Sequence, residues 1–229
     1  MWWYRALHAQ VLDALDSVRP SHGRLLDAGC GTGGFLARLR RERPDQAAAG
    51  LEYNPRAAER AQAKSGVPVA AGTINAMPFA DASFSVVVSL DVLSHAAVDP
   101  ARALAEMQRV LRPGGVLIVN LPAFEWLRST HDVRVQNARR FTRATTSVML
   151  AAAGLTQVRP YYWNSLLLPM MVLHRKVLAR SPERRSDVSQ FPPWLDNSLH
   201  AVTRLERRLL ASGFPFPAGG SVLATALRP

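Results

Sequence analysis

The sequence predicts an α/β fold in which a mostly parallel, seven-stranded sheet carries helices on both faces and has an antiparallel last strand. Two observations predict this fold. From Arg24 onward, short apolar or β-branched runs alternate with amphipathic stretches, which is typical of βα units. After Gly154 the alternation changes, because a long helical stretch separates the last two strand-like runs. We therefore expect a helical insertion between the sixth and seventh strands.

The expected strands share a run of apolar or β-branched residues bounded by glycine, proline or polar residues. They lie at residues 24–28, 47–52, 67–71, 83–90, 115–121, 156–163 and 221–227. The expected helices share apolar residues at helical spacing. They lie at residues 1–20, 34–43, 55–65, 100–111, 143–153, 166–178 and 194–211. Pro55 and Pro100 begin two of these helices, at the position where a missing N–H is least harmful.

Length and composition predict one domain over residues 1–229, with a helical insertion or lid at 164–214. The chain has 229 residues and is 48% hydrophobic, which is enough to bury a substantial core. Its single cysteine cannot form an internal disulfide, and its first 17 residues lack the apolar core of a signal peptide. We therefore expect a cytoplasmic protein. The longest apolar stretch, residues 161–173, is shorter than the roughly 20 residues that span a bilayer.

A net charge of +11 raises the question of a nucleic-acid partner. The basic residues are mostly arginines dispersed along the predicted helices, and their densest runs are not interleaved with aromatic residues that could stack on bases. This pattern favours a solvated arginine-rich surface, so nucleic acid is not the expected partner. No His/Cys cluster has the spacing of a zinc site, and we expect no metal. Peripheral contact with a membrane and a homodimer are both compatible with the sequence.

A glycine-rich turn joins the first predicted strand to the next helix, in the run Leu25-Leu26-Asp27-Ala28-Gly29-Cys30-Gly31-Thr32-Gly33-Gly34. Glycines let the backbone approach a ligand closely there. The run also matches the G-x-G-x-x-G pattern of dinucleotide-binding proteins. However, Asp27 would repel a pyrophosphate at this position, whereas it would attract the cationic sulfonium and ammonium groups of S-adenosylmethionine.

Two further segments agree with an adenosine-bearing cofactor. Glu52 ends the second predicted strand, where a carboxylate can accept both ribose hydroxyls, although NAD would be served equally well. Thr73 and Ile74 follow the third strand, where an adenine edge is expected. The three signals together favour S-adenosylmethionine over a dinucleotide.

These segments resemble the class I S-adenosylmethionine-dependent methyltransferases, in particular the small-molecule enzymes of the ubiquinone-biosynthesis type. The resemblance is carried by 26–33, by 77–84 and by Leu111-Arg112-Pro113-Gly114-Gly115, which we expect to precede the fifth strand. It implies a Rossmann-like fold, S-adenosylmethionine as cofactor and S-adenosylhomocysteine as product. The cofactor-binding residues that it implies are Asp27, Gly29, Cys30, Gly31, Glu52, Tyr53, Thr73, Ile74, Ser89 and Leu90. Many relatives carry Asp where this chain has Thr73.

Histidine is the side chain best suited to remove a proton from an acceptor near neutral pH. His131, with Asp132 beside it, follows the fifth strand and is the first candidate for a catalytic base. The alternative is that His131 and Asp132 cap and pin a loop, with Arg140 paired to an acid. His95 follows the fourth strand and is the second candidate, although packing near the cofactor explains it as well.

Arg140, Tyr162 and Asn164 are the expected substrate-binding residues, with residues 166–173 as a hydrophobic lid. This mixture of aromatic walls and few polar groups favours a small apolar or aromatic acceptor. We therefore expect an enzyme that methylates O, N or C of such a metabolite. A lipid-linked acceptor, a nucleic-acid acceptor and a non-methylating protein that binds the same cofactor are the alternatives.

Overall fold

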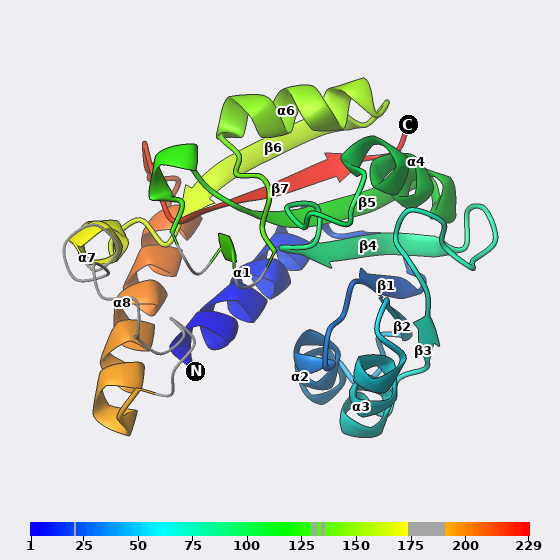
Figure 1. Ribbon diagram of the computed structural model, residues 1–229, viewed down its shortest axis with the longest axis horizontal. Coiled ribbons are helices and arrows are strands. Elements are labelled where there is room, and N and C mark those ends of the chain that lie inside the picture. The colour runs from blue at the N-terminus through cyan, green and yellow to red at the C-terminus, as the bar shows by residue number, and fades with distance from the viewer. Residues whose placement is uncertain (21, 130–131, 134–135, 174–190) are drawn as a thin grey trace.

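The computed structural model describes residues 1–20, 22–129, 132–133, 136–173 and 191–229 (Figure 1). Its strands form one seven-stranded sheet in the order β3-β2-β1-β4-β5-β7-β6. They are β1 (Leu25–Ala28), β2 (Ala48–Glu52), β3 (Val69–Ala71), β4 (Phe84–Leu90), β5 (Leu111–Pro122), β6 (Thr156–Trp163) and β7 (Ser221–Leu227). β7 runs antiparallel to both of its neighbours, while the remaining pairs are parallel. The predicted fold class is confirmed.

The helices follow the predicted positions closely. They are α1 (Trp2–Val18), α2 (Gly34–Glu42), α3 (Pro55–Ser65), α4 (Pro100–Val110), α6 (Arg143–Ala152), α7 (Leu168–Leu173) and α8 (Pro193–Ala211), with a 3-10 turn η1 (Glu125–Leu127). Side chains before the two proline-started helices cap them: Asn54 accepts hydrogen bonds from two backbone N–H groups of α3, and Asp99 does the same for α4. The predicted helix at 166–178 begins later, at Leu168, and its last five positions lie outside the described residues.

Two helical layers cover the sheet (Figure 1). α4 and α6 cover one face, where Leu104, Met107 and Leu150 pack into a buried apolar cluster. α1 and α2 cover the other face, where Leu7 and Phe35 belong to a second buried cluster. Because successive strand residues point to opposite faces, neighbouring residues of one strand enter different clusters. The core thus holds both faces of the central strands away from water and leaves their ends free.

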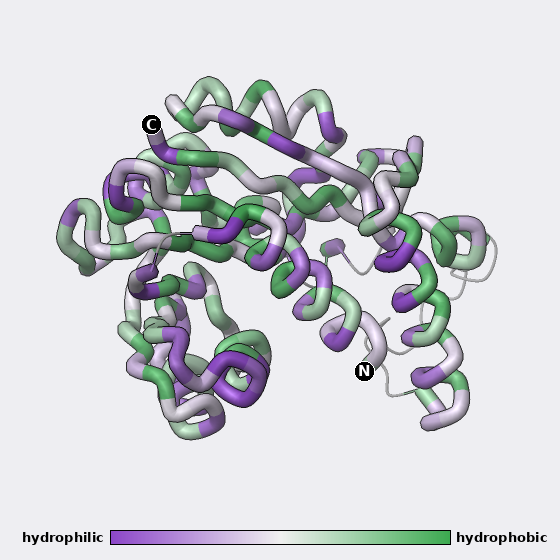
Figure 2. Tube along the Cα trace, turned by 180° about the vertical axis from the view of Figure 1, so that it is seen from behind, coloured by the Kyte–Doolittle hydropathy of each residue, from purple (hydrophilic) through white to green (hydrophobic). Residues whose placement is uncertain are grey.

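α8 lies beside α1, as Figure 2 shows from behind. Two ion pairs join the helices: Arg5 Nη1 lies 3.1 Å from Asp196 Oδ2 near their starts, and Arg207 Nη2 lies 2.6 Å from Asp13 Oδ1 further along. Both helices therefore run in the same direction from the carboxyl end of the sheet. Within the insertion between β6 and β7, α8 is thus held against the first helix of the chain.

The segment from Leu111 to Gly115 differs from the expectation that it precedes the fifth strand, because β5 already begins at Leu111. The backbone gives the reason. Gly114 N–H donates to the carbonyl of Arg228, and Arg228 N–H donates to the carbonyl of Gly115. The chain just after β7 therefore extends the ladder along β5, which local sequence does not reveal.

Candidate functional site

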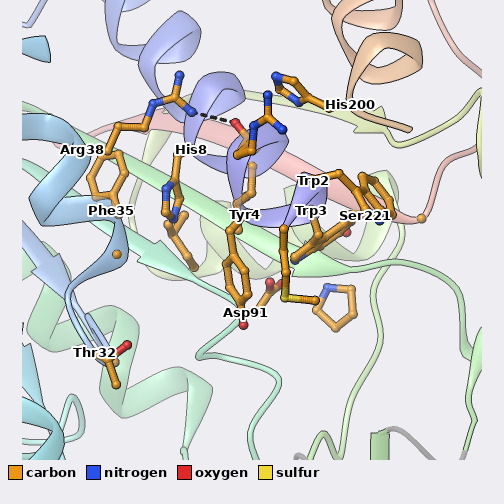
Figure 3. Close-up of a pocket in the computed structure, with 18 of the residues that line it drawn as sticks. Trp2, Trp3, Tyr4, His8, Thr32, Phe35, Arg38, Asp91, His200 and Ser221 are labelled. Atoms are coloured by element: carbon orange, nitrogen blue, oxygen red, sulfur yellow. Dashed lines mark hydrogen bonds between the residues drawn. The ribbon is translucent and has the colours of Figure 1, made fainter. Parts of the chain in front are cut away.

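A cavity of about 1450 Å³ opens at the carboxyl ends of β1 and β4. The start of α1, the glycine-rich turn, α7, α8 and the start of β7 contribute to its wall, so it brings together segments from both ends of the chain (Figure 3). Ligand sites of parallel sheets lie at this edge. This cavity is the candidate functional site.

The glycine-rich turn between β1 and α2 forms one side of the cavity. Gly31 has a φ of 55°, and a Cβ placed on it would meet no atom within 4 Å, so the backbone is open toward the cavity there. Gly33, with a φ of 74°, is closed in by packing, because an added Cβ would lie 2.7 Å from Ala61 Cα. No side chain caps the start of α2. Free backbone N–H groups at a helix start suit an anionic part of a ligand.

Three carboxylates stand at the ends of three adjacent strands. Asp27 belongs to β1, Glu52 ends β2, and Asp91 directly follows β4. The parallel register aligns Asp27 with Gly50 on one side and with Val88 on the other, which places these strand ends next to one another. The resulting edge is rich in negative charge and suits a cationic ligand.

Asp27 is buried, with an exposed fraction of 1%, and its Oδ1 has no hydrogen-bond partner in the described part of the protein. Burial first, and the nearby carboxylate of Glu52 second, raise its pKa to about 7. A buried polar atom without a partner is costly unless a ligand satisfies it. Asp27 therefore fits a cationic cofactor group and does not fit a pyrophosphate.

Glu52 is held by backbone donors. Gly31 N–H donates to Glu52 Oε2 at 2.9 Å, and Asn54 N–H donates to Oε1 at 3.0 Å. These bonds fix the carboxylate beside the glycine-rich turn, where each oxygen keeps further capacity to accept hydroxyl groups.

Cys30 also lies in the turn, and it is the wrong kind of group for a nucleophile. Burial, together with the negative charges of Asp27 and Glu52, raises the pKa of its thiol to about 12. The thiol therefore stays protonated, and it packs against Leu36, Ala61 and Val67.

The other predicted cofactor residues are spread around this core. Leu90 lines the cavity, whereas Ser89 is buried with its hydroxyl unpartnered among the described residues. Ile74 is buried, and the hydroxyl of Thr73 accepts a hydrogen bond from the backbone N–H of Asn75. Tyr53 is 79% exposed. The cavity wall includes Asp27, Gly29, Cys30, Gly31 and Leu90 but does not include Glu52, Tyr53, Thr73, Ile74 or Ser89.

Asp91 was not among the predicted catalytic residues, and a chain of contacts positions it. Asn120 Nδ2 donates to Asp91 Oδ1 at 2.8 Å, and Trp163 Nε1 donates to Asn120 Oδ1 at 2.7 Å. The ring of Trp163 stacks on Trp3 of α1, with 4.8 Å between the ring centroids. Burial is the main cause that raises the pKa of Asp91 to about 7. The backbone of Asp91 has a φ of 60°, an uncommon conformation that often marks functional positions.

The first helix supplies the cavity wall that the sequence did not indicate. Trp2, Trp3 and Tyr4 line the cavity, and Tyr4 points toward Asp91 (Figure 3). Burial first, and the nearby charge of Asp91 second, raise the pKa of Tyr4. One turn further, burial lowers the pKa of His8 to about 4, so this imidazole is neutral at pH 7. Tyr4 and His8 are four residues apart and therefore lie on one face of α1, and this spacing is the signal that could have found them.

The predicted catalytic residues lie in different surroundings. His131 lies outside the described residues. Asp132 is buried and forms an ion pair with Arg140, whose Nη2 lies 2.8 Å from Asp132 Oδ1. Arg140 also donates to the carbonyl of Ala123 at 2.7 Å, so the pair ties the loop after β5 to the strand end. His95 lines the same cavity. The catalytic roles of these residues stay predictions.

Tyr162 and Asn164 do not line this cavity. The Tyr162 hydroxyl accepts a hydrogen bond from the backbone N–H of Arg143, and its ring stacks on Phe124. Asn164 is fully buried behind Gly220, with its Nδ2 against the sulfur of Met171. Of the predicted substrate-binding residues, Arg140 lines the cavity. The apolar part of the wall comes mostly from Trp2, Trp3, Tyr4, Met170, Met171, Phe191, Leu195 and Leu199.

Among the residues that the structure describes, no group of three or more His, Cys, Asp or Glu side chains is arranged to hold a metal ion. Within the same described ranges, no helix is long and apolar enough to cross a membrane.

Comparison with known proteins agrees with the geometry. The family profile described as "Methyltransferase domain" matches residues 26–119, which run from β1 into β5. The malonyl-[acyl-carrier protein] O-methyltransferase of Dechloromonas aromatica is 36% identical over 49% of this chain and 41% of its own length. The demethylmenaquinone methyltransferase of Roseiflexus castenholzii is 38% identical over 51% of each chain. This chain thus spans about half the length of these curated relatives or less.

A solved structure extends the fold comparison to the whole chain. The S-adenosylmethionine-dependent methyltransferase of Thermotoga maritima superposes with a TM-score of 0.63, covering 99% of this chain and 91% of its own. The two sequences are 23% identical, so this likeness supports the fold alone.

Proposed function

Because the chain belongs to the class I S-adenosylmethionine-dependent methyltransferases, we propose that it methylates a nitrogen or oxygen atom of a small molecule with an apolar or aromatic body. The observation that carries this proposal is the cavity, whose lining combines apolar and aromatic side chains with the carboxylates of Asp27 and Asp91 at the strand ends. Such pockets hold an apolar molecule and orient it by a few polar groups.

S-adenosylmethionine, when bound, supplies a methyl group activated by a positively charged sulfur. The residues present fit this cofactor. Asp27, with its unpartnered Oδ1, and the open backbone at Gly31 would hold the methionine part, and Glu52 would hold the ribose. Ser89, Leu90, Thr73, Ile74 and the exposed Tyr53 remain proposed contacts on the basis of the family resemblance.

Asp91 is the group best placed to take the proton that an N–H or O–H acceptor gives up. A general base works best when its pKa lies near the working pH, and the pKa of Asp91 is about 7. Asn120 holds one of its oxygens at 2.8 Å and thereby fixes its orientation. Tyr4, which points toward Asp91, would complete the polar end of the acceptor site (Figure 3).

Trp2 and Trp3 would supply the apolar surface against which the acceptor body packs. Each aromatic ring buries a large area and excludes water from the polar end of the cavity. Alignment of the acceptor is then the main contribution of the protein, and it can be worth roughly 7–11 kcal/mol. His131 and His95 remain proposed alternatives for the base.

The test measures release of S-adenosylhomocysteine with a panel of phenols and aromatic amines, against glycine, malonate, transfer RNA and lipid vesicles. We expect turnover with members of the aromatic set. Turnover restricted to RNA or to vesicles would overturn the acceptor class. With an acceptor in hand, Asp91→Asn should keep cofactor affinity and lower kcat by roughly 10²–10⁴-fold, whereas Asp45→Asn, at an exposed carboxylate, should change neither. Unchanged kcat in Asp91→Asn with loss in His131→Gln would move the base to His131.

A further inference from the structure

A second cavity, of about 800 Å³, lies between the later part of α1, the later part of α8 and the strands β6 and β7. It shares no lining residue with the first cavity. α1 lines the first cavity with residues from its first two turns, and it lines the second with Gln10, Asp13, Ala14 and Ser17, so the two hollows lie along the same helix. The volume falls within the ~300–1,000 Å³ range of small-molecule sites.

Positive charge dominates the lining of this second cavity. Its basic residues are Arg143, Arg159, Arg204, Arg207 and Arg208, whereas Asp13 is the one acidic residue among the described residues of its wall. Asp13 is already engaged, because Arg207 donates to both of its oxygens at 2.6 Å.

Apart from Arg143, which has no ion pair there but lies over the ring of Tyr162, three of these arginines have no ion pair within the described part of the chain: Arg159, Arg204 and Arg208. They come from two elements, since Arg159 belongs to β6 while Arg204 and Arg208 lie one turn apart on α8. Figure 2 shows the hydrophilic segments of α1, α8 and β6 around this region. Like charges gathered around a hollow repel one another, and a phosphate group relieves that repulsion while matching the planar guanidinium fork.

Aromatic side chains form the other part of the lining. Phe214 and Phe216 meet edge to face, with ring centroids 4.9 Å apart. Phe214 is 51% exposed although it is large and apolar. Tyr161 adds a ring whose hydroxyl lies 3.3 Å from Gln10 Oε1, so an amide and a hydroxyl stand beside the rings. Such a surface suits a flat ring that carries hydrogen-bonding groups.

The geometry points to a second binding site for a nucleoside di- or triphosphate, with its phosphates on Arg159, Arg204 and Arg208 and its base against Phe214 and Tyr161. The site is separate from the cofactor cavity and lies along the same two helices. It would take a single nucleotide in a hollow between α1, α8 and the strands β6 and β7, unlike the open basic stripe that follows a polynucleotide backbone.

The test is calorimetric titration of the full chain with ATP and GTP, in buffer saturated with S-adenosylhomocysteine so that the first cavity is filled. Adenosine and inorganic pyrophosphate are the comparators. We expect both triphosphates to bind at least tenfold more tightly than either comparator. The double variant Arg159→Gln/Arg204→Gln should lose at least tenfold in affinity, while Arg60→Gln, at an exposed arginine on α3, should bind as the parent does. Phe214→Ala should weaken ATP binding more than pyrophosphate binding.

The inference is overturned if ATP and GTP fail to bind, if Arg60→Gln weakens binding as much as the double variant, or if pyrophosphate binds as tightly as ATP. Binding that appears only without S-adenosylhomocysteine and that the double variant leaves intact would place the nucleotide in the cofactor cavity and would also overturn it. Binding of RNA without binding of mononucleotides would have the same consequence. Circular dichroism of each variant establishes that the fold is retained.

Discussion

Asp27→Asn removes a buried negative charge while keeping the size and shape of the side chain. In the parent, the pKa of Asp27 is raised from 3.8 to about 7, so the carboxyl is mostly protonated at pH 6 and mostly ionised at pH 8. A cationic cofactor binds the ionised form. The ionised fraction falls about tenfold from pH 8 to pH 6 for a pKa of 7, so cofactor affinity should fall by about the same factor, which is roughly 1.4 kcal/mol.

The same carboxyl makes the free protein less stable as the pH rises. Because its folded pKa is above its unfolded pKa, the folded state holds the proton more tightly, and stability is lost as the pH climbs from about 4 toward about 7. Full ionisation of Asp27 in the folded state, which is reached above pH 7, lowers the free energy of unfolding by at most about 4 kcal/mol relative to acid pH. About 1.4 kcal/mol of this decrease falls between pH 6 and pH 8. Asp27→Asn should therefore bind S-adenosylmethionine weakly and with a flat pH profile, yet unfold at higher urea than the parent at pH 8.

Calorimetry at pH 6, 7 and 8 and urea unfolding without ligand measure the two effects. Asp45→Asn repeats the chemical change at an exposed site and should match the parent. Asp91, whose pKa is also about 7, titrates in the same range, so Asp91→Asn is measured in parallel; this variant should keep the slope in cofactor affinity that Asp27 causes. The reasoning fails if the parent profile is flat, or if Asp27→Asn keeps the slope of the parent.

Two further predictions concern the stability of the glycine-rich turn and of the buried ion pair between Arg140 and Asp132. Gly33→Ala should destabilise the fold by at least about 1 kcal/mol more than Gly66→Ala. Both glycines have positive φ, but an added Cβ at Gly33 meets Ala61, whereas at Gly66 it meets open space. Equal urea midpoints for the two variants would refute the packing argument. Arg140→Met should lower the free energy of unfolding by roughly 3–5 kcal/mol, because it leaves the buried Asp132 carboxylate without its guanidinium. Arg38→Ala breaks the surface pair with Glu42 and should lower it by less than about 1 kcal/mol. A similar cost for both variants would show that burial does not set the strength of the Arg140 pair.

The sheet could be predicted from the sequence because its signals are local. Most strands are short runs rich in apolar residues, and Asn54 and Asp99 precede the proline-started helices that they cap. The positions of Asp27 and Glu52 at neighbouring strand ends follow from the order of βα units alone.

The cavity wall could not be predicted, because it depends on contacts between distant parts of the chain. Trp2 N–H donates to Asp196, which is 194 residues away, and no periodicity reports such a pair. The role of Asp91 could not be predicted for the same reason, since its orientation depends on Asn120 of β5 and Trp163 of β6. Tyr162 shows the converse: its place in an aromatic run indicates a pocket wall, but the pleat of β6 turns it toward Phe124.

The stack of Trp3 on Trp163 gives the protein an optical property. Two indoles with centroids 4.8 Å apart and ring planes 21° from parallel couple their excited states, so they contribute a paired signal to near-ultraviolet circular dichroism. Trp3 belongs to α1, while Trp163 belongs to β6 and donates a hydrogen bond to Asn120, whose amide holds Asp91. Any displacement of α1 from the sheet separates the two transition dipoles and weakens that signal. The position of α1, which forms one wall of the first cavity, can therefore be followed in solution without attaching a label.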